Sequence, residues 1–429
     1  MRASFDVVVV GGGPGGIAAA VIAAEAGLPV CLLDDNAAPG GQIWRGAQAQ
    51  RGAHLAHGRE FHAWTDRLQR TNCTVLPHWQ ATAQPISHVL RVEHEDEVRD
   101  LKFKHLVIAT GARERFLPFP GWTLPGVMGA GGLQAFVRSG LDPRGKRVVI
   151  AGTGPLLLAI AAGVSDAGAT VIGIFEQAPL ARLLRFGLHL AGQPNKLMEG
   201  AQYRRKTLGT PYRTGSWVTR VEGTGHVQRV YVSDGREEWG IACDWLATGF
   251  HLVPNLELPN LVGCRIDGDY VAVDERQQSS VPGIACVGEL TGIGGVEKAL
   301  LEGQVAGWAA AGNDAKIQAT LPRLKRYRRF AQQLDSAFAL RSELRELAEA
   351  ETVVCRCEDV LHAQLTKCSS WREAKLHTRC GMGACQGRIC GTATESLFGW
   401  KCGGTRPPIF PAAVSAVAAE PEPHQPASR

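Results

Sequence analysis

The feature that most constrains this chain is a pattern that occurs twice along it. Residues 6–10 form an apolar, β-branched run that leads into Gly11-x-Gly13-x-x-Gly16. An alanine-rich segment, residues 17–26, follows, and a second apolar run, residues 30–33, ends at Asp34. A β-branched run predicts a strand buried in a parallel sheet, and glycines directly after it predict a tight turn into a helix. The sequence therefore predicts a strand–turn–helix–strand unit here.

The second copy begins near the middle of the chain. It repeats the apolar run, the glycine turn, the helix and the closing strand at residues 147–150, Gly152-x-Gly154, residues 156–167 and residues 170–175, the last ending at Glu176. Each unit later closes on the tripeptide Ala-Thr-Gly, at residues 109–111 and 247–249. The chain is thus predicted to be an α/β protein with two Rossmann-like dinucleotide-binding domains.

The first copy has the context that a dinucleotide-binding turn requires. Gly11 permits the tight turn, Gly13 lets the backbone approach a pyrophosphate, and Gly16 lets helix and strand pack closely. The helix N-terminus offers free N–H groups to the phosphates, and Asp34 can accept hydrogen bonds from the adenosine ribose, with Asp35 as the alternative if the register differs by one residue. The predicted cofactor-binding residues are Gly11, Gly13, Pro14, Gly15, Gly16 and Asp34.

The second copy departs from the pattern at one position. Leu157 stands where the third glycine is expected, and a leucine there separates helix from strand or crowds a phosphate. Gly152, Gly154 and Glu176 are therefore a candidate second nucleotide site with three interpretations open: NAD, another adenine nucleotide such as ATP, or a fold element that binds nothing. If Glu176 faces a ribose, it argues against NADP, because NADP carries a 2′-phosphate there.

Charge and hydropathy exclude several classes of function. The 46 basic and 41 acidic side chains leave a net charge of +5, too small to indicate nucleic-acid binding or more than peripheral membrane association. The basic runs at residues 203–206 and 323–329 are predicted to be solvated helix faces. Two uncharged stretches, residues 7–24 and 148–165, are interrupted by glycine and proline and are not expected to span a membrane. No signal-like segment opens the sequence, so a cytoplasmic location is expected.

Cysteines gather at the carboxyl end, where seven of the twelve lie in the last 79 residues. In a cytosolic chain such crowding indicates a metal rather than disulfides. Four thiolates are what a small iron–sulfur cluster needs, and glycines nearby let backbone N–H groups reach the sulfurs. The predicted ligands are Cys355, Cys357, Cys385 and Cys390, with Cys380 in reserve and Cys368 and Cys402 as bystanders. A structural zinc site is the alternative, although a Cys-x-Cys pair is atypical of one.

Motifs between about positions 5 and 312 resemble the two-dinucleotide-fold flavoproteins, the group that includes thioredoxin reductase and ferredoxin reductases. The resemblance rests on the opening glycine turn, residues 39–43, the two Ala-Thr-Gly closures and residues 280–289. It implies FAD as the cofactor, with Glu289 holding the ribityl chain. It adds the cofactor-binding residues Gly41, Gln42, Thr110, Gly111, Gly288 and Glu289. No Cys-x2-Cys or Cys-x4-Cys precedes position 355, so dithiol exchange beside the flavin is not expected.

The carboxyl-terminal region resembles the bacterioferritin-associated-ferredoxin-like module, which binds a two-iron two-sulfur cluster, although the usual second ligand pair of that module is Cys-x2-Cys. Taken whole, the chain resembles the larger, alpha-type subunit of heteromeric dye-linked amino-acid dehydrogenases. That family includes opine oxidases, proline and hydroxyproline dehydrogenases and hydrogen cyanide synthase. The resemblance rests on residues 353–360, 378–388 and 406–408 together with the flavoprotein motifs, and it covers about positions 5 to 412.

These resemblances and the repeat predict a domain plan. The predicted parts are an FAD-binding domain at residues 1–118 and 250–320, a second dinucleotide fold at 119–249, a helical linker at 321–351, a small Cys-rich iron–sulfur domain at 352–412 and a tail at 413–429. The tail is rich in proline, alanine and glutamate and is expected to be disordered.

The family resemblance also implies a function. A partner flavoprotein subunit similar to sarcosine oxidase oxidises the amine, and this chain relays the electrons to a respiratory or artificial acceptor. A small third subunit is compatible with it, as is an FMN at the interface of the subunits. Three alternatives stay open: a subunit of hydrogen cyanide synthase that acts on glycine, a self-contained NADH-dependent acceptor reductase, and a non-catalytic scaffold with a zinc module. No catalytic acid–base set can be identified from the sequence.

Overall fold

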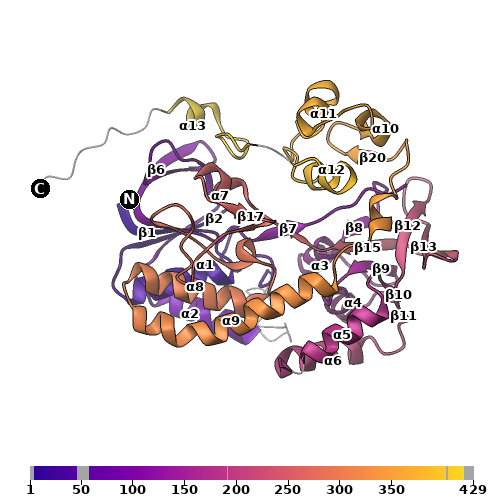
Figure 1. Cartoon of the computed structure of the whole chain (residues 1–429), viewed down its shortest axis with the longest axis horizontal. Helices are drawn as coiled ribbons and strands as arrows, with labels where there is room; N and C mark the ends of the chain where they lie inside the picture. Colours follow the sequence, from indigo (N-terminus) through magenta and orange to yellow (C-terminus); the bar gives the residue numbers. More distant parts are fainter. Residues whose placement is uncertain (1–3, 46–57, 191, 402–403, 420–429) are drawn as a thin grey trace, which may run out of the picture. The chain divides into compact units, whose positions relative to one another are not determined.

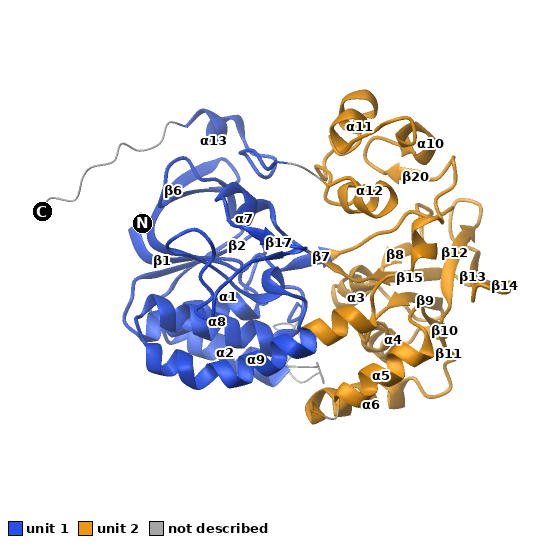
Figure 2. Ribbon diagram, viewed as in Figure 1, with its two compact units in different colours: residues 1–113, 254–331, 404–429 blue, residues 114–253, 332–403 orange. Residues whose placement is uncertain are grey.

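The computed structural model describes residues 4–45, 58–190, 192–401 and 404–419 (Figure 1). The chain forms two compact units (Figure 2). Unit 1 comprises residues 1–113, 254–331 and 404–429, and unit 2 comprises residues 114–253 and 332–403. Strands β7 (Ala112–Glu114) and β16 (Leu252–Pro254) stand at two of the points where the chain passes from one unit to the other.

Unit 1 is built on a sheet of seven strands with the first predicted strand near its centre. The strand order is β3-β2-β1-β6-β5-β4, and β19 also pairs with β6. The strands are β1 (Ser4–Val10), β2 (Val30–Asp34), β3 (Thr74–Pro77), β4 (Gln80–Ala83), β5 (Val89–His94), β6 (Glu97–Ile108) and β19 (Ile284–Cys286), with a small ladder of β17 (Ile266–Asp267) and β18 (Tyr270–Val271). The helices are α1 (Pro14–Glu25), α2 (Gly58–Gln69), α7 (Glu257–Leu261), η1 (Gly288–Thr291), α8 (Val296–Ala310) and α13 (Val414–Ala418), and α9 (Asp314–Ala337) begins in this unit.

The first apolar run is continuous because both faces of β1 are buried. Val8 and Val10 contribute to one apolar cluster, and Val7 and Val9 contribute to another on the opposite face. Helices α1, α2 and α8 supply side chains to the second cluster and cover that face of the sheet (Figure 1). β1 pairs parallel with β2 and with β6, as a doubly covered sheet requires.

Two helices of unit 1 approach so closely that only glycine fits between them. A Cβ added to Gly303 of α8 would lie 2.0 Å from the carbonyl oxygen of Gly15 in α1. Gly307, one turn further on, faces Ile22 of α1 in the same way, with 2.7 Å to the Ile22 Cβ. This contact fixes the N-terminus of α1 beside the residues that follow β19.

Unit 2 carries the second copy of the repeat. Its parallel sheet has the order β11-β10-β9-β15-β8, and a separate antiparallel sheet has the order β12-β13-β14. The strands are β8 (Val127–Gly129), β9 (Arg147–Thr153), β10 (Thr170–Glu176), β11 (Tyr212–Thr214), β12 (Trp217–Glu222), β13 (Arg229–Ser233), β14 (Glu238–Ala242) and β15 (Trp245–Phe250). The helices are α3 (Ala130–Arg138), α4 (Leu156–Asp166), α5 (Leu180–Leu190) and α6 (Pro194–Lys206).

The cysteine-rich region is a small module within unit 2. It contains β20 (Val353–Cys355), β21 (Val360–Leu361), α10 (His362–Leu365), α11 (Trp371–Thr378) and α12 (Cys390–Phe398), and η2 (Ser342–Arg345) precedes it. The module has an apolar cluster of its own that includes Val354, Leu365 and Ala393. The Trp122 indole Nε1 donates a 2.6 Å hydrogen bond to the Val353 carbonyl, which attaches β20 to the dinucleotide-type fold.

The predicted fold class is confirmed: the chain is α/β with two dinucleotide-type folds and a small cysteine-rich module. The predicted domain limits stay predictions. The two compact units divide the chain at 113/114, 253/254, 331/332 and 403/404. None of the described helices is long and apolar enough to cross a membrane.

The tail differs from its prediction at its beginning. Val414–Ala418 forms the short helix α13, and Ala416 is buried. Arg91, itself 6% exposed, donates hydrogen bonds to the carbonyls of Ala416 and Ala419, at 3.1 and 2.6 Å. A buried guanidinium needs such acceptors, so the first residues of the tail are held against unit 1. Residues 420–429 lie outside the described residues, as does Cys402.

Candidate cofactor sites

In the glycine turn after β1, two glycines leave no room for a side chain and a third faces open space. Gly11 has φ +105°, and an added Cβ would lie 2.3 Å from the Ala109 carbonyl oxygen. An added Cβ at Gly16 would lie 1.8 Å from the Gly11 carbonyl oxygen. At Gly13, by contrast, no described atom lies within 4 Å of an added Cβ. The space above Gly13 is the position at which the fingerprint predicts a pyrophosphate.

Asp34 ends β2 beside this turn and is 5% exposed. Its Oδ2 accepts a hydrogen bond from the Gly12 N–H at 2.5 Å, and its Oδ1 accepts from the Asn36 N–H and the Asn36 side-chain amide at 2.8 and 2.7 Å. A carboxylate has about four acceptor positions, so one remains for a ribose hydroxyl. Asp34 therefore also holds the glycine turn in place. The alternative residue, Asp35, is exposed.

A second loop lies against the turn. The Gly40 N–H donates to the Gly12 carbonyl at 2.7 Å, and an added Cβ at Gly41 would lie 2.9 Å from the Gly13 Cα. Gln42 follows and is exposed. Trp44 is 2% exposed, and its indole Nε1 has no hydrogen-bond partner among the described residues. A buried N–H without an acceptor indicates that a bound group can contribute one here.

Thr110 and Gly111, at the first Ala-Thr-Gly closure, are fixed by Asn255. The Asn255 side-chain amide donates to the Thr110 carbonyl at 2.7 Å, and the Asn255 N–H donates to the Gly111 carbonyl at 3.0 Å. Gly111 has φ +66°, and no described atom lies within 4 Å of an added Cβ. This closure, like Gly13, is open on one side.

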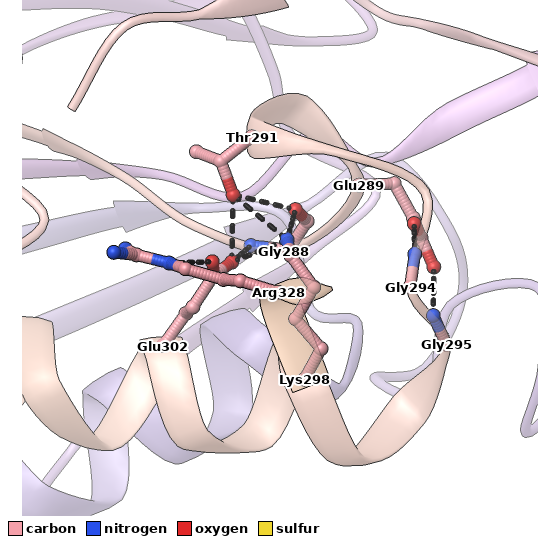
Figure 3. A network of polar contacts seen from close by, with 8 residues as sticks. All are labelled: Gly288, Glu289, Thr291, Gly294, Gly295, Lys298, Glu302 and Arg328. Atoms are coloured by element: carbon pink, nitrogen blue, oxygen red, sulfur yellow. Dashed lines mark hydrogen bonds and ion pairs between the residues drawn. The ribbon is translucent and has the colours of Figure 1, made fainter. Parts of the chain in front are cut away.

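The turn at Gly288 is held by a buried ion pair (Figure 3). Lys298 and Glu302, one helical turn apart on α8, are 1% and 0% exposed, with 2.9 Å between Nζ and Oε2. The same Oε2 accepts from the Gly288 N–H at 2.9 Å and the Thr291 hydroxyl at 2.7 Å. Lys298 also donates to the Gly288 carbonyl, and the Arg328 Nε lies 3.5 Å from Oε1 of Glu302.

Glu289 points away from this ion pair toward the start of α8 (Figure 3). Its two carboxylate oxygens accept hydrogen bonds from the N–H groups of Gly294 and Gly295, at 2.9 and 3.2 Å. Burial raises the pKa of Glu289 above its ordinary value. The acidic residue predicted to hold a ribityl chain thus also orders the loop that begins α8.

Unit 1 therefore brings the predicted first-site residues into one set of loops. The open space at Gly13, the unpartnered Trp44 Nε1 and the free acceptor position on Asp34 fit a dinucleotide with its pyrophosphate on the N-terminus of α1. The donor and acceptor groups of these residues are those that FAD would need.

In unit 2 the second candidate site is arranged differently. Glu176 is 0% exposed and receives hydrogen bonds from the Thr153 hydroxyl, the Gly154 N–H and the Ala178 N–H, at 3.0, 2.7 and 2.8 Å. Burial raises the pKa of Glu176 to about 7. Leu157 is buried in the core, and Gly249 leaves room for it, since an added Cβ there would lie 3.3 Å from the leucine. The leucine therefore packs as a core residue.

Residues 338–341, which we call the covering segment, lie against the same strand ends. The Thr153 hydroxyl is 3.1 Å from the Phe338 carbonyl oxygen. The Gln177 amide, 0% exposed, donates to the Ala339 carbonyl at 3.3 Å and accepts from the Arg341 N–H at 3.1 Å. The polar groups that would face an adenosine are thus bonded within the chain.

The cysteines of the C-terminal module gather around one small cavity. Its lining includes Phe116, Trp122 and four cysteines, Cys355, Cys357, Cys385 and Cys390. The Sγ atoms of Cys355, Cys380 and Cys390 all lie within 4.8 Å of one another, and these three residues are buried. Cys357 is exposed and interacts with Cys385. The structure therefore brings together the four predicted ligands and the reserve, while Cys368 lies apart in contact with Gln364.

Hydrogen bonds divide the roles of the three buried thiols. Hydrogen bonds from the thiols of Cys380 and Cys390 lower the pKa of Cys355 to about 2. Hydrogen bonds from the backbone N–H groups of Gly381 and Glu358 lower it as well. The contacts among the three thiols raise the pKa of Cys390 above its ordinary value. A thiolate that already receives backbone N–H donors is suited to a positively charged metal centre.

Three glycines of this module pack closely against Cys357 or Trp371. An added Cβ at Gly383 would lie 2.2 Å from the Cys357 Cβ, and one at Gly381 would lie 2.6 Å from the Trp371 ring. Gly387 packs on the same ring, 3.2 Å away by the same measure. Trp371 and these glycines together set the path of the loop that carries the second group of cysteines.

The fold and these two sites define a class: an oxidoreductase with two dinucleotide folds and a thiol-rich module. A family model described as pyridine nucleotide-disulphide oxidoreductase matches residues 5–315. The HcnB subunit of hydrogen cyanide synthase from Pseudomonas aeruginosa is 31% identical over 419 residues, covering 89% of this chain and 90% of that protein. An opine oxidase subunit from Rhizobium meliloti, the one designated A, is 31% identical over 422 residues, covering 92% of each chain.

Among solved structures, L-proline dehydrogenase from P. horikoshii has a TM-score of 0.68 at 20% identity, covering 97% of this chain and 80% of that one. Thioredoxin reductase of T. acidophilum has a TM-score of 0.58 at 23% identity, covering 73% of this chain and 100% of that one. These two likenesses concern the fold. The chain belongs to the pyridine nucleotide-disulphide oxidoreductase family and, within it, to the group that contains HcnB and its opine oxidase counterpart.

Sequence reasoning missed three groups that shape these sites. Glu114 accepts hydrogen bonds from the Gly131 and Gly132 N–H groups at 2.6 and 2.9 Å and so caps α3, and burial raises its pKa. The pairing of Lys298 with Glu302 could have been suspected from their four-residue spacing. The covering segment gave no sequence signal, because its contacts are mostly made by backbone carbonyls.

The buried ion pair predicts a stability effect. Lys298→Met is expected to lower the free energy of unfolding by about 3 kcal/mol or more, because the buried Glu302 would keep two neutral donors but no cation closer than Arg328 at 3.5 Å. Urea denaturation measures it. Lys325→Met is the matched control, since Lys325 and its partner Glu275 are more than half exposed, and its effect should stay below about 1 kcal/mol. Equal effects of the two substitutions would contradict the assignment.

Proposed function

We propose that this chain is the FAD- and iron–sulfur-containing electron-relay subunit of a heteromeric amino-acid dehydrogenase acting on an opine, proline, hydroxyproline or a similar secondary amine. The chain takes electrons from a partner flavoprotein subunit similar to sarcosine oxidase and passes them to a respiratory or artificial acceptor. The observation that carries the proposal is the presence, in one chain, of an open dinucleotide turn at Gly13 and a cavity lined by four cysteines.

The comparisons support the assembly and the class of chemistry. HcnB and its opine oxidase counterpart are both named as subunits of larger enzymes, and the alpha subunit of sarcosine oxidase from a Corynebacterium is 30% identical over 189 residues. L-proline dehydrogenase shares the fold. A small third subunit is compatible with this proposal.

FAD would be held in unit 1, with its pyrophosphate over Gly13 and its adenosine ribose near Asp34. The N-terminus of α1 stabilises the negative charge of the phosphates, and the tight packing of α1 on α8 keeps that terminus in place. The Lys298–Glu302 pair keeps the Gly288 turn rigid, so that Glu289 meets the cofactor in one orientation.

A two-iron two-sulfur cluster would be held by Cys355, Cys357, Cys385 and Cys390. FAD accepts electrons in pairs and such a cluster passes them singly, which suits a relay to one-electron acceptors. The chain contributes the backbone N–H groups that stabilise thiolates and the aromatic side chains of Phe116 and Trp122 that limit water in the cavity.

The closed second fold favours a partner protein over NADH as the electron source. The Thr153 hydroxyl and the Gln177 side chain are bonded to the covering segment, so these two side chains are not free to meet an NADH adenosine. This weakens the alternative of a self-contained NADH-dependent reductase.

A subunit of hydrogen cyanide synthase is the second candidate, because HcnB and its opine oxidase counterpart are equally similar to this chain at 31% identity. Supplying glycine to the complete complex and assaying cyanide distinguishes the two functions, since an opine or proline dehydrogenase should release none.

The open space at Gly13 predicts a cofactor defect without a folding defect. Gly13→Val is expected to abolish FAD binding, because the side chain would occupy the pyrophosphate position, while the backbone at φ −73° accepts any residue. The ratio of flavin to protein absorbance and the melting temperature of the apoprotein measure the two effects. A variant that keeps stoichiometric FAD would show that the cofactor binds elsewhere.

The ligand assignment is tested by comparing single cysteines. Cys357→Ala should lose iron, acid-labile sulfide and electron transfer to the acceptor while keeping FAD, whereas Cys380→Ala should keep the cluster. Cys368→Ala is the control, since that thiol contacts the Gln364 carbonyl and lies apart from the other described thiols of the module. Loss of iron in Cys380→Ala but not in Cys357→Ala would instead assign the site to Cys355, Cys380 and Cys390, and zinc without sulfide would contradict the cluster.

The closed second fold predicts the response to NADH. Under anaerobic conditions, millimolar NADH should leave the flavin absorbance of the isolated chain unchanged, because the Gln177 side chain beside Glu176 is already bonded to the covering segment. Dithionite, which needs no nucleotide site, is the positive control. Rapid bleaching by NADH would revive the reductase alternative.

A further inference from the structure

Helices α5 and α6 carry an unusual number of exposed apolar side chains. Fourteen large apolar side chains in the described residues are at least 39% exposed, and six of them lie within residues 180–208. The six are Leu180, Leu184, Leu188, Leu197, Met198 and Leu208, each between 50% and 79% exposed. Scattered single exposures need no explanation, but a concentration of them does. We call α5 and α6 with their flanking residues, 177–190 and 192–210, the helical hairpin.

The leucines of α5 form one stripe. Leu180, Leu184 and Leu188 recur every four residues, so they share a face of the helix, while Phe186 is the side chain that α5 buries in the unit. Figure 1 shows α5 and α6 next to each other at the edge of unit 2, and α6 contacts α4. Other residues thus pack α5 and α6 into the unit, and the leucine stripe contributes nothing to the core.

The same segment holds the positive charge of the protein. Between residues 177 and 210 there are six basic side chains and one acidic one, a net charge of +5, which equals the net charge of the whole chain. The single acid, Glu199, is paired with Lys196 at 3.0 Å. Arg185 and Arg205 are exposed. The rest of the chain is therefore close to neutral, and a charge balance that looks small over the whole sequence is concentrated on two helices.

We propose that the helical hairpin docks this protein onto an anionic lipid bilayer surface. Exposed leucines beside arginines and lysines are the arrangement of helices that lie in the membrane interface, where the apolar side chains enter the acyl boundary and the cations contact lipid phosphates. The helices have 11 and 13 residues, too short to span a bilayer and long enough to lie on one. The basic run at residues 203–206, expected from the sequence to be a solvated face, is part of this surface.

The area of the hairpin favours lipid over a protein partner. At 1.5 Å per residue and about 10 Å in width, the two helices present roughly 400 Å². A stable protein interface needs about 800 Å² on each side. Interfacial binding to a bilayer has no such threshold, because affinity grows with each inserted side chain and each basic residue. The inference involves no redox step, so it stands or falls separately from the proposed function.

Vesicle sedimentation of the full-length holoprotein tests the proposal. The protein should sediment with vesicles of phosphatidylcholine containing about one-third phosphatidylglycerol, and only weakly with phosphatidylcholine alone, with binding reduced by added salt. The double variant Leu184→Ser/Leu188→Ser should bind at least about tenfold more weakly, and Arg185→Gln/Arg205→Gln should lose the preference for phosphatidylglycerol.

Leu376→Ser is the matched control, since Leu376 is 70% exposed on α11 of the same unit but lies outside the hairpin. It should bind as the wild type does. The substituted side chains are exposed, so melting temperatures should be unchanged and folding is not in question. A wild type that stays in the supernatant, or a leucine double variant that sediments as well as the wild type, overturns the proposal. So does loss of a copurifying enzyme subunit in the double variant without vesicle binding by the wild type, which would assign the hairpin to a protein interface.

Discussion

The contact between the backbones of α1 and α8 is the constraint on which unit 1 depends. Gly303 reaches the carbonyl of Gly15 at a distance that no side chain permits, and Gly16 is equally restricted by Gly11. Because these contacts leave no freedom, the N-terminus of α1 and the Gly288 turn are held in one arrangement. The open space at Gly13 persists because its neighbours are fixed. The open position at Gly13 is in this sense a product of close packing elsewhere.

The sequence correctly predicted those parts of the fold that depend on residues close to one another along the chain. Both strand–turn–helix units depend on residues within about thirty positions, and their apolar runs are visible because both faces of the strands are buried. The groups that could not be predicted are paired across longer distances. Glu114 caps a helix that begins sixteen residues later, and Arg328 reaches Glu302 from another helix. Such pairs matter for stability because they are buried. Burial is known only once the chain is folded, so the sequence does not reveal these pairs.

The cysteine module shows where spacing ceases to be informative. Spacing indicated which region carries thiols, but which sulfurs meet depends on the loop that Trp371 and its neighbouring glycines shape. That loop brings Cys380 to the buried pair Cys355 and Cys390, and leaves Cys357 with Cys385. Five thiols therefore lie around one site, and neither the spacing nor the packing determines which of them would bind a metal.

The two copies of the repeat share a sequence pattern but differ in what lies against their strand ends. In the first copy the acid at the end of the second strand keeps an acceptor position free, and the glycine turn faces open space. In the second, Glu176 also accepts three hydrogen bonds and Gly154 is also open on one side, but the covering segment lies against Thr153 and bonds to Gln177. That segment joins α9 to the cysteine module, so the contacts that close the nucleotide fold also anchor the start of the module.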